Sequence, residues 1–265
     1  IEGNKKATIT IKQLLGTAAF DFPKPVELLE RAVLIGTNEN DIVLDFFSGS
    51  ATTAHAVMSL NSKFKTNRKF ICVQLPEQCD EKSEAYKAGY SNICEIGKER
   101  IRRAGAKLLE ESVSAQLQLG EEEKKPLDVG FKVFKLDTSN LKTWDGTPIQ
   151  DKQIDLFYER LNAMIDTVKD DRTDMDVVYE VMLKMGIPLD VEVQYMEIND
   201  KIAYIVGDFI LMICLADKIT AEDIETMTQY APAKIVCAEA GFADDSALSN
   251  AHYILKDRAI ELKLV

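Results

Sequence analysis

Runs of apolar residues bounded by polar ones mark the first hundred positions of the chain. Two of these runs, Asp41–Phe47 and Phe70–Leu75, predict buried strands of a parallel sheet. A short alternation at Ala7–Ile11 predicts another strand, which a turn at Gly16 follows. An apolar stripe at helical spacing, after two prolines, predicts a helix over Val26–Ile35.

Two further helices are expected in this part of the chain. The first, over Thr52–Leu60, follows a turn of small residues, and the second extends over Ser91–Ser112. The second helix carries apolar or small residues on one stripe, and we expect its arginines to point away from that stripe. The stripe consists of Ile93, Gly97, Ile101, Ala104 and Leu108.

The second half of the chain predicts alternating helices and strands. The polar segment 120–126 is the best linker candidate, and alternation at Phe131–Leu136 predicts a strand directly after it. Two helices are expected within residues 151–186. Beyond them, strands are expected near residues 191–197, 201–206, 209–216, 233–238 and 260–265, with helices near 221–229 and 244–256. This order predicts an α/β fold whose strands begin antiparallel.

The 265 residues carry a formal net charge of −12, with the acidic residues concentrated in the second half. Residues 1–115 have a net charge of +1, and residues 116–265 have −13. An acidic surface disfavours nonspecific nucleic-acid binding by the whole chain. Two basic patches remain in the near-neutral half. The patch Lys63–Lys69 is equally consistent with DNA contact and with solvation, whereas Lys98–Lys107 predicts a solvated helix face with a Glu99–Arg103 pair.

Neither membrane insertion nor a metal centre is expected. The longest apolar stretch, Phe209–Ala216, has eight residues, whereas a helix that crosses a bilayer needs roughly 20. Five cysteines without a C-x-x-C pair, together with two histidines, supply no zinc ligand set. We expect free thiols, a structural His55, and a cytoplasmic protein without a secretory signal.

The segment Asp41–Thr53 carries the candidate chemistry. A strand ends in Asp45, a turn of small residues around Gly49 follows, and a helix then begins with two threonines. Ligands of open α/β sheets bind beyond the carboxyl ends of the strands. Small residues let a ligand approach the backbone closely, and the first N–H groups of a helix carry partial positive charge. The segment can therefore hold a carboxylate, a phosphate or a ribose.

Two common phosphate-binding motifs are absent from the sequence. The loop has one glycine, Gly49, where the dinucleotide motif G-x-G-x-x-G has three, and no P-loop sequence occurs. One glycine beside an acidic residue suits a ligand with an amino-acid moiety, whose carboxylate would face the loop amides and whose ammonium would meet Asp45. S-adenosylmethionine is such a ligand, and an ordinary structural loop is the alternative.

The sequence around this loop resembles the amino-group DNA methyltransferases. In that family a K-P-x-x-L-L helix precedes a D-x-F-x-G-S-G-T-T loop, to which Lys24–Leu29 and Asp45–Thr53 correspond. The segments Asn67–Glu77 and Ile93–Arg103 resemble in particular the modification (Mod) subunit of type III restriction-modification systems. These subunits are site-specific DNA adenine-N6 methyltransferases of a permuted class, in which the cofactor motif lies downstream of the catalytic tetrad. The resemblance extends, more weakly, over nearly the whole chain.

The resemblance implies a set of cofactor-binding residues. The loop would hold the methionine end of S-adenosylmethionine, and the turn at residues 22–24 would close over the cofactor. Gln74 would contact the ribose, where related enzymes often have an acidic residue. The complete set is Phe22, Pro23, Lys24, Asp45, Phe46, Phe47, Ser48, Gly49, Ser50, Thr52, Thr53 and Gln74. Ala51 replaces the commoner glycine of the loop, so we expect a more restricted backbone there.

The family's catalytic [DNS]-P-P-[YFW] tetrad does not occur, because the seven prolines include no Pro-Pro pair. We therefore assign no catalytic residue and expect the C-terminal part of a longer protein, inactive alone and without the base-flipping pocket. The expected fold is a partial, Rossmann-like S-adenosylmethionine-dependent methyltransferase sheet followed by a smaller α/β domain. The expected divisions are residues 1–120 for cofactor binding, 121–186 for a connecting strand and helices, and 187–265 for an acidic C-terminal domain.

The parent protein is expected to methylate adenine N6 at a specific DNA site. Its expected partners are DNA, bound through the full-length protein, and the restriction nuclease-helicase subunit or a second copy of the chain. Two other classes of function stay open. One is a non-catalytic interaction module with a vestigial cofactor fold, which Ala51 and Gln74 favour. The other is a Rossmann-type NAD-dependent oxidoreductase, which the single loop glycine disfavours.

Overall fold

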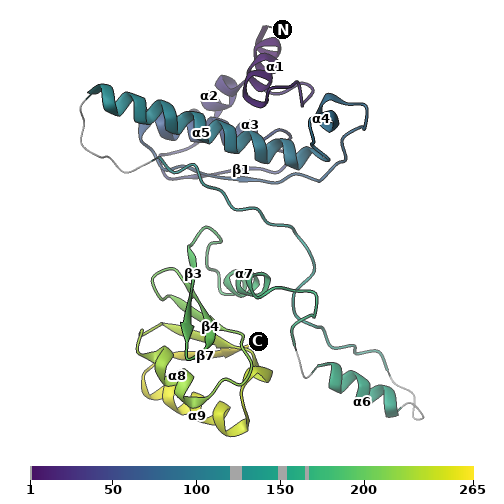
Figure 1. Cartoon of the computed structure of the whole chain (residues 1–265), viewed down its shortest axis with the longest axis vertical. Coiled ribbons are helices and arrows are strands. Elements are labelled where there is room, and N and C mark those ends of the chain that lie inside the picture. The colour runs from purple at the N-terminus through teal and green to yellow at the C-terminus, as the bar shows by residue number, and fades with distance from the viewer. Residues whose placement is uncertain (1, 120–126, 149–153, 165–166) are drawn as a thin grey trace. The chain divides into compact units, whose positions relative to one another are not determined.

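The computed structural model describes residues 2–119, 127–148, 154–164 and 167–265. The chain forms two compact units, residues 1–131 and residues 132–265 (Figure 1). The linker expected at residues 120–126 lies outside the described residues. No helix in the described ranges is long and apolar enough to cross a membrane.

The first unit is built on a two-stranded parallel sheet. Strand β1 (Ile42–Asp45) pairs with β2 (Lys69–Cys72), and α3 (Thr52–Phe64) connects them. The predicted helix α2 (Val26–Gly36) is confirmed, and the long helix α5 (Ile93–Leu119) carries the predicted stripe. The remaining described helices of this unit are α1 (Glu2–Leu15) and α4 (Glu84–Lys87).

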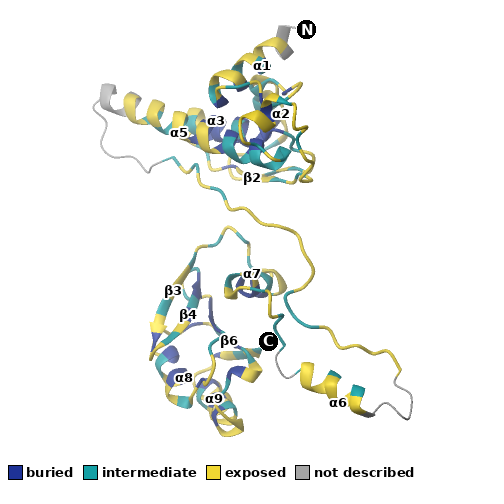
Figure 2. Ribbon diagram, turned by 45° about the vertical axis from the view of Figure 1, so that its right-hand side comes forward, coloured by how far each residue is buried: buried dark blue, intermediate teal, exposed yellow. Residues whose placement is uncertain are grey.

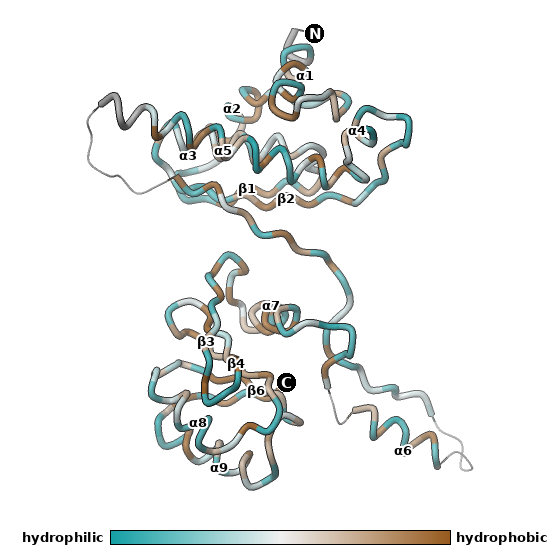
Figure 3. Tube along the Cα trace, viewed as in Figure 1, coloured by the Kyte–Doolittle hydropathy of each residue, from teal (hydrophilic) through white to brown (hydrophobic). Residues whose placement is uncertain are grey.

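Helices cover the sheet of the first unit on one face only. The inward side chains Val43, Phe70 and Cys72 pack against the α3 and α5 side, where α3 is largely buried (Figure 2). The outward side chains Ile42 and Leu44 are exposed within this unit, although both strands are strongly apolar (Figure 3). The predicted strands form, but the prediction that they are buried was wrong, because alternate side chains reach the helices from one face only.

The strand predicted at Ala7–Ile11 is instead part of α1. Ala7, Ile11 and Leu15 recur every four residues and are buried. The helical period therefore determines which side chains reach the core, and the shorter two-residue alternation is incidental. Gly16 ends the helix at φ +79°, and its N–H donates to the Lys12 carbonyl at 2.8 Å. The predicted turn at Gly16 is confirmed.

The second unit contains a mixed sheet of strand order β3-β4-β5-β6-β7 among its described residues. Neighbouring strands are antiparallel from β3 to β5 and parallel from β5 to β7. The strands are β3 (Val193–Ile198), β4 (Lys201–Val206), β5 (Leu211–Cys214), β6 (Lys234–Cys237) and β7 (Glu261–Leu264). The helices are α6 (Ile154–Ala163), α7 (Asp174–Lys184), α8 (Ala221–Thr228) and α9 (Asp245–Asp257), with a short 3₁₀ turn η1 (Glu239–Gly241). The predicted order, with its antiparallel beginning, is confirmed.

Both faces of this second sheet are covered. Helices α8 and α9 pack on one face, and α7 packs on the other, where Val178 and Met182 contact Leu211 and Ile213. The division expected after residue 186 therefore separates α7 from the sheet on which it packs. By compactness the structure divides the chain after residue 131, and α7 belongs to the second unit.

The strand predicted at Phe131–Leu136 was wrong, because these residues pair with no neighbouring strand. In the second unit a side chain holds the segment: Nζ of Lys132 donates to the carbonyls of Leu189 and Val191 at 2.9 and 2.8 Å. An alternating pattern specifies a strand only where a partner backbone is available to complete the ladder.

A buried carboxylate, Asp223, joins α8 to the turn between β3 and β4. It is 1% exposed and accepts hydrogen bonds from the Thr220 N–H, from Nδ2 of Asn199 and from Nζ of Lys201, at 2.8, 3.1 and 3.2 Å. Burial raises the pKa of Asp223, but these hydrogen bonds and the Lys201 charge together outweigh burial and hold the pKa below its usual value. Asp223 therefore stabilises the unit in its ionised form.

We expect Asp223→Asn to lower the free energy of unfolding by about 2 kcal/mol, because it leaves Lys201 without its buried partner. Asp200 pairs with the same Nζ at 3.0 Å, but its side chain is 84% exposed. Asp200→Asn is thus the matched control, with an expected loss below about 0.5 kcal/mol. Urea denaturation of the full chain, followed by circular dichroism, measures both variants. Equal losses would contradict the structural role of Asp223.

Candidate functional site

The candidate site lies where the carboxyl ends of β1 and β2 meet the start of α3. Backbone hydrogen bonds continue the strand pairing beyond the ladder: the Val73 N–H donates to the Asp45 carbonyl at 2.8 Å, and the Ser48 N–H donates to the Val73 carbonyl at 3.2 Å. The loop after β1 is therefore anchored before α3 begins. Parallel α/β sheets bind their ligands at this edge.

The loop turns through two residues in the left-handed region of the backbone. Gly49 has φ +51°, and Ala51, which precedes α3, has φ +57°. The Phe20 ring lies 3.1 Å from the position that a Cβ on Gly49 would occupy, so glycine meets both a conformational and a steric demand. Ala51 adopts the same conformation with a buried methyl group, which is less favourable than glycine there. The expectation of a restricted backbone at Ala51 agrees with this geometry.

Asp45 lies half-buried at the start of the loop. One carboxylate oxygen accepts the Thr53 hydroxyl at 2.5 Å, and the other accepts the Phe47 N–H at 3.2 Å. Neither partner carries a charge, and no lysine or arginine of the described chain pairs with Asp45. The carboxylate can therefore receive a cationic group such as an ammonium.

Gln74 braces the loop from the β2 side. Its Oε1 accepts the Gly49 N–H at 2.8 Å, and its Nε2 donates to the Leu75 carbonyl at 3.2 Å. The side chain predicted to contact a ribose thus has two intramolecular partners in this structure. The first contact requires only an acceptor oxygen, which glutamine and glutamate both provide.

The side chains of Ser50 and Thr52, predicted to hold a cofactor, turn inward. Both residues are buried, and both hydroxyl oxygens accept from Nη1 of Arg100 on α5, at 2.8 and 2.7 Å. Only their backbone groups can face a ligand. The first-turn N–H groups of α3 have no partner within the helix, and that of Ala54 bonds to the Cys72 thiol, so those of Thr52 and Thr53 are the ones that can face a ligand.

Arg100 is the residue of this region that sequence reasoning missed. It is 1% exposed, so the prediction that the arginines of this helix point away from its apolar stripe was wrong for Arg100, whereas it holds for the exposed Arg102 and Arg103. The signal was present, since Arg100 lies three residues after Gly97 and four before Ala104, which places it on the stripe. Helix α5 packs against the loop at Gly97, where a Cβ would lie at ordinary contact distance, 3.4 Å, from the Gly49 carbonyl oxygen.

The other predicted residues form an exposed rim. Phe46 and Phe47 follow β1 directly and are exposed, with ring centroids 5.3 Å apart. Phe22 is 82% exposed at φ +53°, and Lys24 beside it is exposed, whereas Pro23 is buried. The predicted residues thus separate into an anchored loop and an open apolar border.

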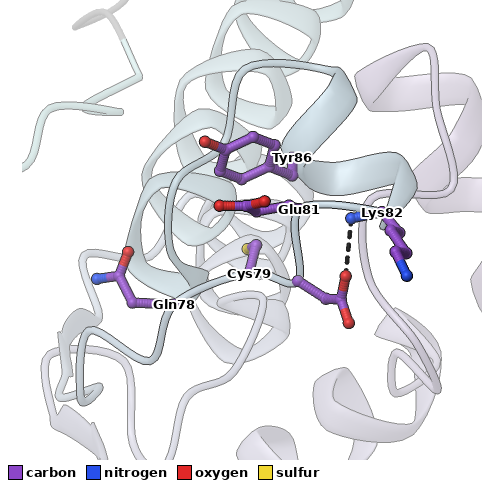
Figure 4. Close-up of a pocket in the computed structure, with 6 residues that line it drawn as sticks. Gln78, Cys79, Glu81, Lys82 and Tyr86 are labelled. Carbon is purple, nitrogen blue, oxygen red and sulfur yellow. Dashed lines mark hydrogen bonds between the residues drawn. The ribbon is translucent and has the colours of Figure 1, made fainter.

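A surface hollow of about 640 Å³ lies in the segment that follows β2 (Figure 4). Its lining includes Cys79, Glu81 and Tyr86, and the Lys82 N–H donates to Oδ1 of Asp80 at 2.7 Å. No hydrogen bond between described residues joins this hollow to the loop after β1. We therefore treat it as separate from the candidate site.

The two predicted basic patches are largely paired or buried. Nζ of Lys63 lies 2.7 Å from a Glu30 carboxylate oxygen, and Arg68 is buried, so the first patch contains a structural arginine. On α5, Nε of Arg103 donates to Glu99 at 2.7 Å, which confirms the predicted pair. These pairs support the interpretation of the exposed α5 charges as a solvated helix face.

His55 lies one turn after Thr52 on α3, with its Nδ1 buried and without a hydrogen-bond partner. Burial, together with the nearby Arg100 charge, lowers the pKa of His55 to about 4. The imidazole is therefore neutral at pH 7. No cluster of histidine, cysteine and acidic side chains in the described ranges could hold a metal ion.

Comparison with known proteins identifies the unit that carries this loop. Residues 2–104 match the family model described as DNA methylase. This part of the chain is therefore similar to DNA methylases. The match begins in α1 and ends in α5, so it includes the whole strand–loop–helix site.

Curated relatives agree with the resemblance to type III Mod subunits. The chain is 46% identical over 128 residues to the EcoPI Mod subunit of Escherichia phage P1 and 40% identical over 132 residues to the EcoP15I Mod subunit of Escherichia coli. It is 36% identical over 145 residues to the StyLTI Mod subunit of Salmonella typhimurium. These matches cover 48%, 49% and 55% of this chain but only 18%, 18% and 21% of the relatives. The chain spans about a fifth of the length of these relatives.

We expect the first unit to lose stability as the pH falls from 6.5 toward 4. In this window the unfolded chain protonates His55, whereas the folded unit, with a pKa of about 4, does not, so protons favour unfolding. A shift of this size corresponds to about 3 kcal/mol.

His55→Gln should remove this pH dependence, and His252→Gln is the matched control because the other histidine is exposed. Urea denaturation at several pH values across the window measures the effect. A His55→Gln variant with the pH dependence of the unsubstituted chain would show that His55 is not its source.

Proposed function

We propose that the first unit binds S-adenosylmethionine at the loop Asp45–Thr53, within a longer DNA adenine-N6 methyltransferase of a type III restriction-modification system. One observation carries the proposal. The loop at the carboxyl ends of two parallel strands turns through two residues with positive φ. It begins at the Asp45 carboxylate, which has no cationic partner among the described residues. The match of this region to DNA methylases and Mod subunits supports the assignment.

In this proposal the loop holds the methionine end of the cofactor. The cofactor carboxylate accepts hydrogen bonds from the backbone N–H groups at the start of α3, where the helix dipole favours negative charge. Asp45 accepts the ammonium group, and the exposed rings of Phe22, Phe46 and Phe47 lie against apolar parts of the cofactor. Lys24 and Pro23 close the turn beside them, and Gln74 approaches the ribose.

The reaction is a displacement in which the exocyclic amine of adenine attacks the sulfonium methyl group. Its rate depends on alignment of the methyl group with the amine. The first unit contributes to this alignment by fixing the methionine end against a rigid sheet edge. We propose that the tetrad that polarises the amine belongs to the longer protein, together with a complete Rossmann-like sheet.

The partners proposed for the whole protein follow from the Mod relatives. They are a specific DNA site and the restriction nuclease-helicase subunit, with a second copy of the chain as the other candidate. We propose that the acidic second unit docks to a protein partner, because its charge disfavours direct contact with phosphates.

Calorimetric titration of the full chain with S-adenosylhomocysteine tests the proposed cofactor site. We expect binding, and Asp45→Asn should weaken it about tenfold to hundredfold, since a charge-assisted contact to the ammonium is lost. Asp41→Asn is the matched control at the other end of the same strand, where the carboxylate accepts from the Asn38 N–H at 2.8 Å.

Binding of NAD with the same affinity as S-adenosylhomocysteine would favour an oxidoreductase. Absence of binding to either ligand would favour the non-catalytic module over the proposed site. A loss of affinity that is the same for Asp41→Asn and Asp45→Asn would show that the ammonium does not meet Asp45.

The substitution Gln74→Glu provides a second test of the site. A carboxylate still accepts the Gly49 N–H, and its second oxygen can accept a ribose hydroxyl more strongly than the amide does. We expect affinity for S-adenosylhomocysteine to rise severalfold, whereas Gln74→Leu should lower it because the Gly49 N–H loses its partner. Equal affinity for all three forms would exclude Gln74 from the site.

A further inference from the structure

Arg100 reaches the back of the loop from α5. Its Nη1 donates to Oγ of Ser50 at 2.8 Å and to Oγ1 of Thr52 at 2.7 Å, and it lies 3.5 Å from the Ser50 carbonyl oxygen. These contacts bracket Ala51, the left-handed residue at which α3 begins. The guanidinium thus contacts the residue before Ala51 and the residue after it.

The charge of Arg100 is not neutralised within the described chain. Its contacts are neutral oxygens, no carboxylate of the described residues pairs with it, and its buried Nε has no partner. Burial alone lowers the pKa of Arg100 to about 10, so the side chain remains charged at pH 7. A buried, unpaired cation is unfavourable, and a purely structural contact to two hydroxyls does not require one.

This charge lies directly behind the N-terminal end of α3. The positive end of the helix dipole and the guanidinium therefore act on the same side of the loop, and both favour an anion in front of it. A low local dielectric strengthens the effect, because Ser50 and Thr52 are buried as well. The start of α3 therefore has two sources of positive potential, the helix dipole and the Arg100 guanidinium, and the second is not part of the loop motif.

We propose that Arg100 is a positioning residue that gives the loop its preference for a carboxylate ligand. It holds Ser50 and Thr52 so that the backbone N–H groups face outward, and it supplies the positive charge that the ligand carboxylate balances. This inference rests on the proposed function, since it specifies how the same site recognises the amino-acid end of S-adenosylmethionine.

The test compares two ligands that differ only at this end: S-adenosylhomocysteine and its carboxamide, which keeps the ammonium but lacks the negative charge. Calorimetry of the full chain should show a preference for the carboxylate. Arg100→Met should reduce affinity for S-adenosylhomocysteine about tenfold to hundredfold and change affinity for the carboxamide less than about threefold. Arg102→Met is the matched control, because Arg102 lies on the same helix with an exposed side chain.

A second variant keeps the test valid if Arg100→Met fails to fold. Thr52→Val removes one acceptor of the guanidinium and retains its charge, so we expect a smaller loss of affinity and a retained preference for the carboxylate. Arg100→Lys keeps the positive charge but lacks the guanidinium that bonds both Ser50 and Thr52. This variant should also retain part of the preference for the carboxylate ligand.

Equal loss of affinity for both ligands in Arg100→Met would overturn the proposal, since it would show a general support of the fold. An unchanged preference in that variant would overturn it as well. If the unsubstituted chain binds neither ligand, the proposed function fails, whereas binding with no carboxylate preference refutes the role of Arg100 alone.

Discussion

The structure of the site depends on the parallel pairing of β1 with β2 beyond the last residues of their ladder. The pairing continues through the Asp45 carbonyl and the Val73 N–H, so both strand ends are fixed at one edge. The turn at Gly49 is then anchored to Gln74, and α3 must begin immediately after it. A polar loop that lacked these bonds would expose or bury unpaired backbone groups, at a cost that a short loop cannot offset elsewhere.

Much of this arrangement follows from local sequence. An apolar run that ends in Asp45, followed by small residues and two threonines, specifies strand, turn and helix within one short segment, and each element forms as predicted. The five-stranded sheet of the second unit was predicted equally well, because β5 and the last three residues of β6 are buried and read as continuous apolar runs. Local patterns suffice where the period and the burial of an element agree.

The remaining features depend on contacts that local patterns do not contain. The alternation at Ala7–Ile11 resembles a strand, but only the positions four residues apart find a core. Phe131–Leu136 alternates without a partner strand, and Arg100 resembles one more charge on a solvated helix. The spacing along α5 places Arg100 on the buried stripe, but its partner Ser50 lies fifty positions away, so the sequence pattern does not show which groups the guanidinium contacts.

The open face of the first sheet bears on how the loop is held. Every described contact that fixes the loop comes from the covered side or from the strand ends: Arg100 and Gly97 from α5, Phe20 from the preceding turn, and Gln74 from β2. The exposed side chains Ile42 and Leu44 contribute none of them. The geometry of the loop is therefore set by one layer of helices and the paired strand ends. The backbone of the loop is therefore ordered before a ligand binds. Binding then loses little free energy to ordering the loop, so more of the interaction energy appears as affinity.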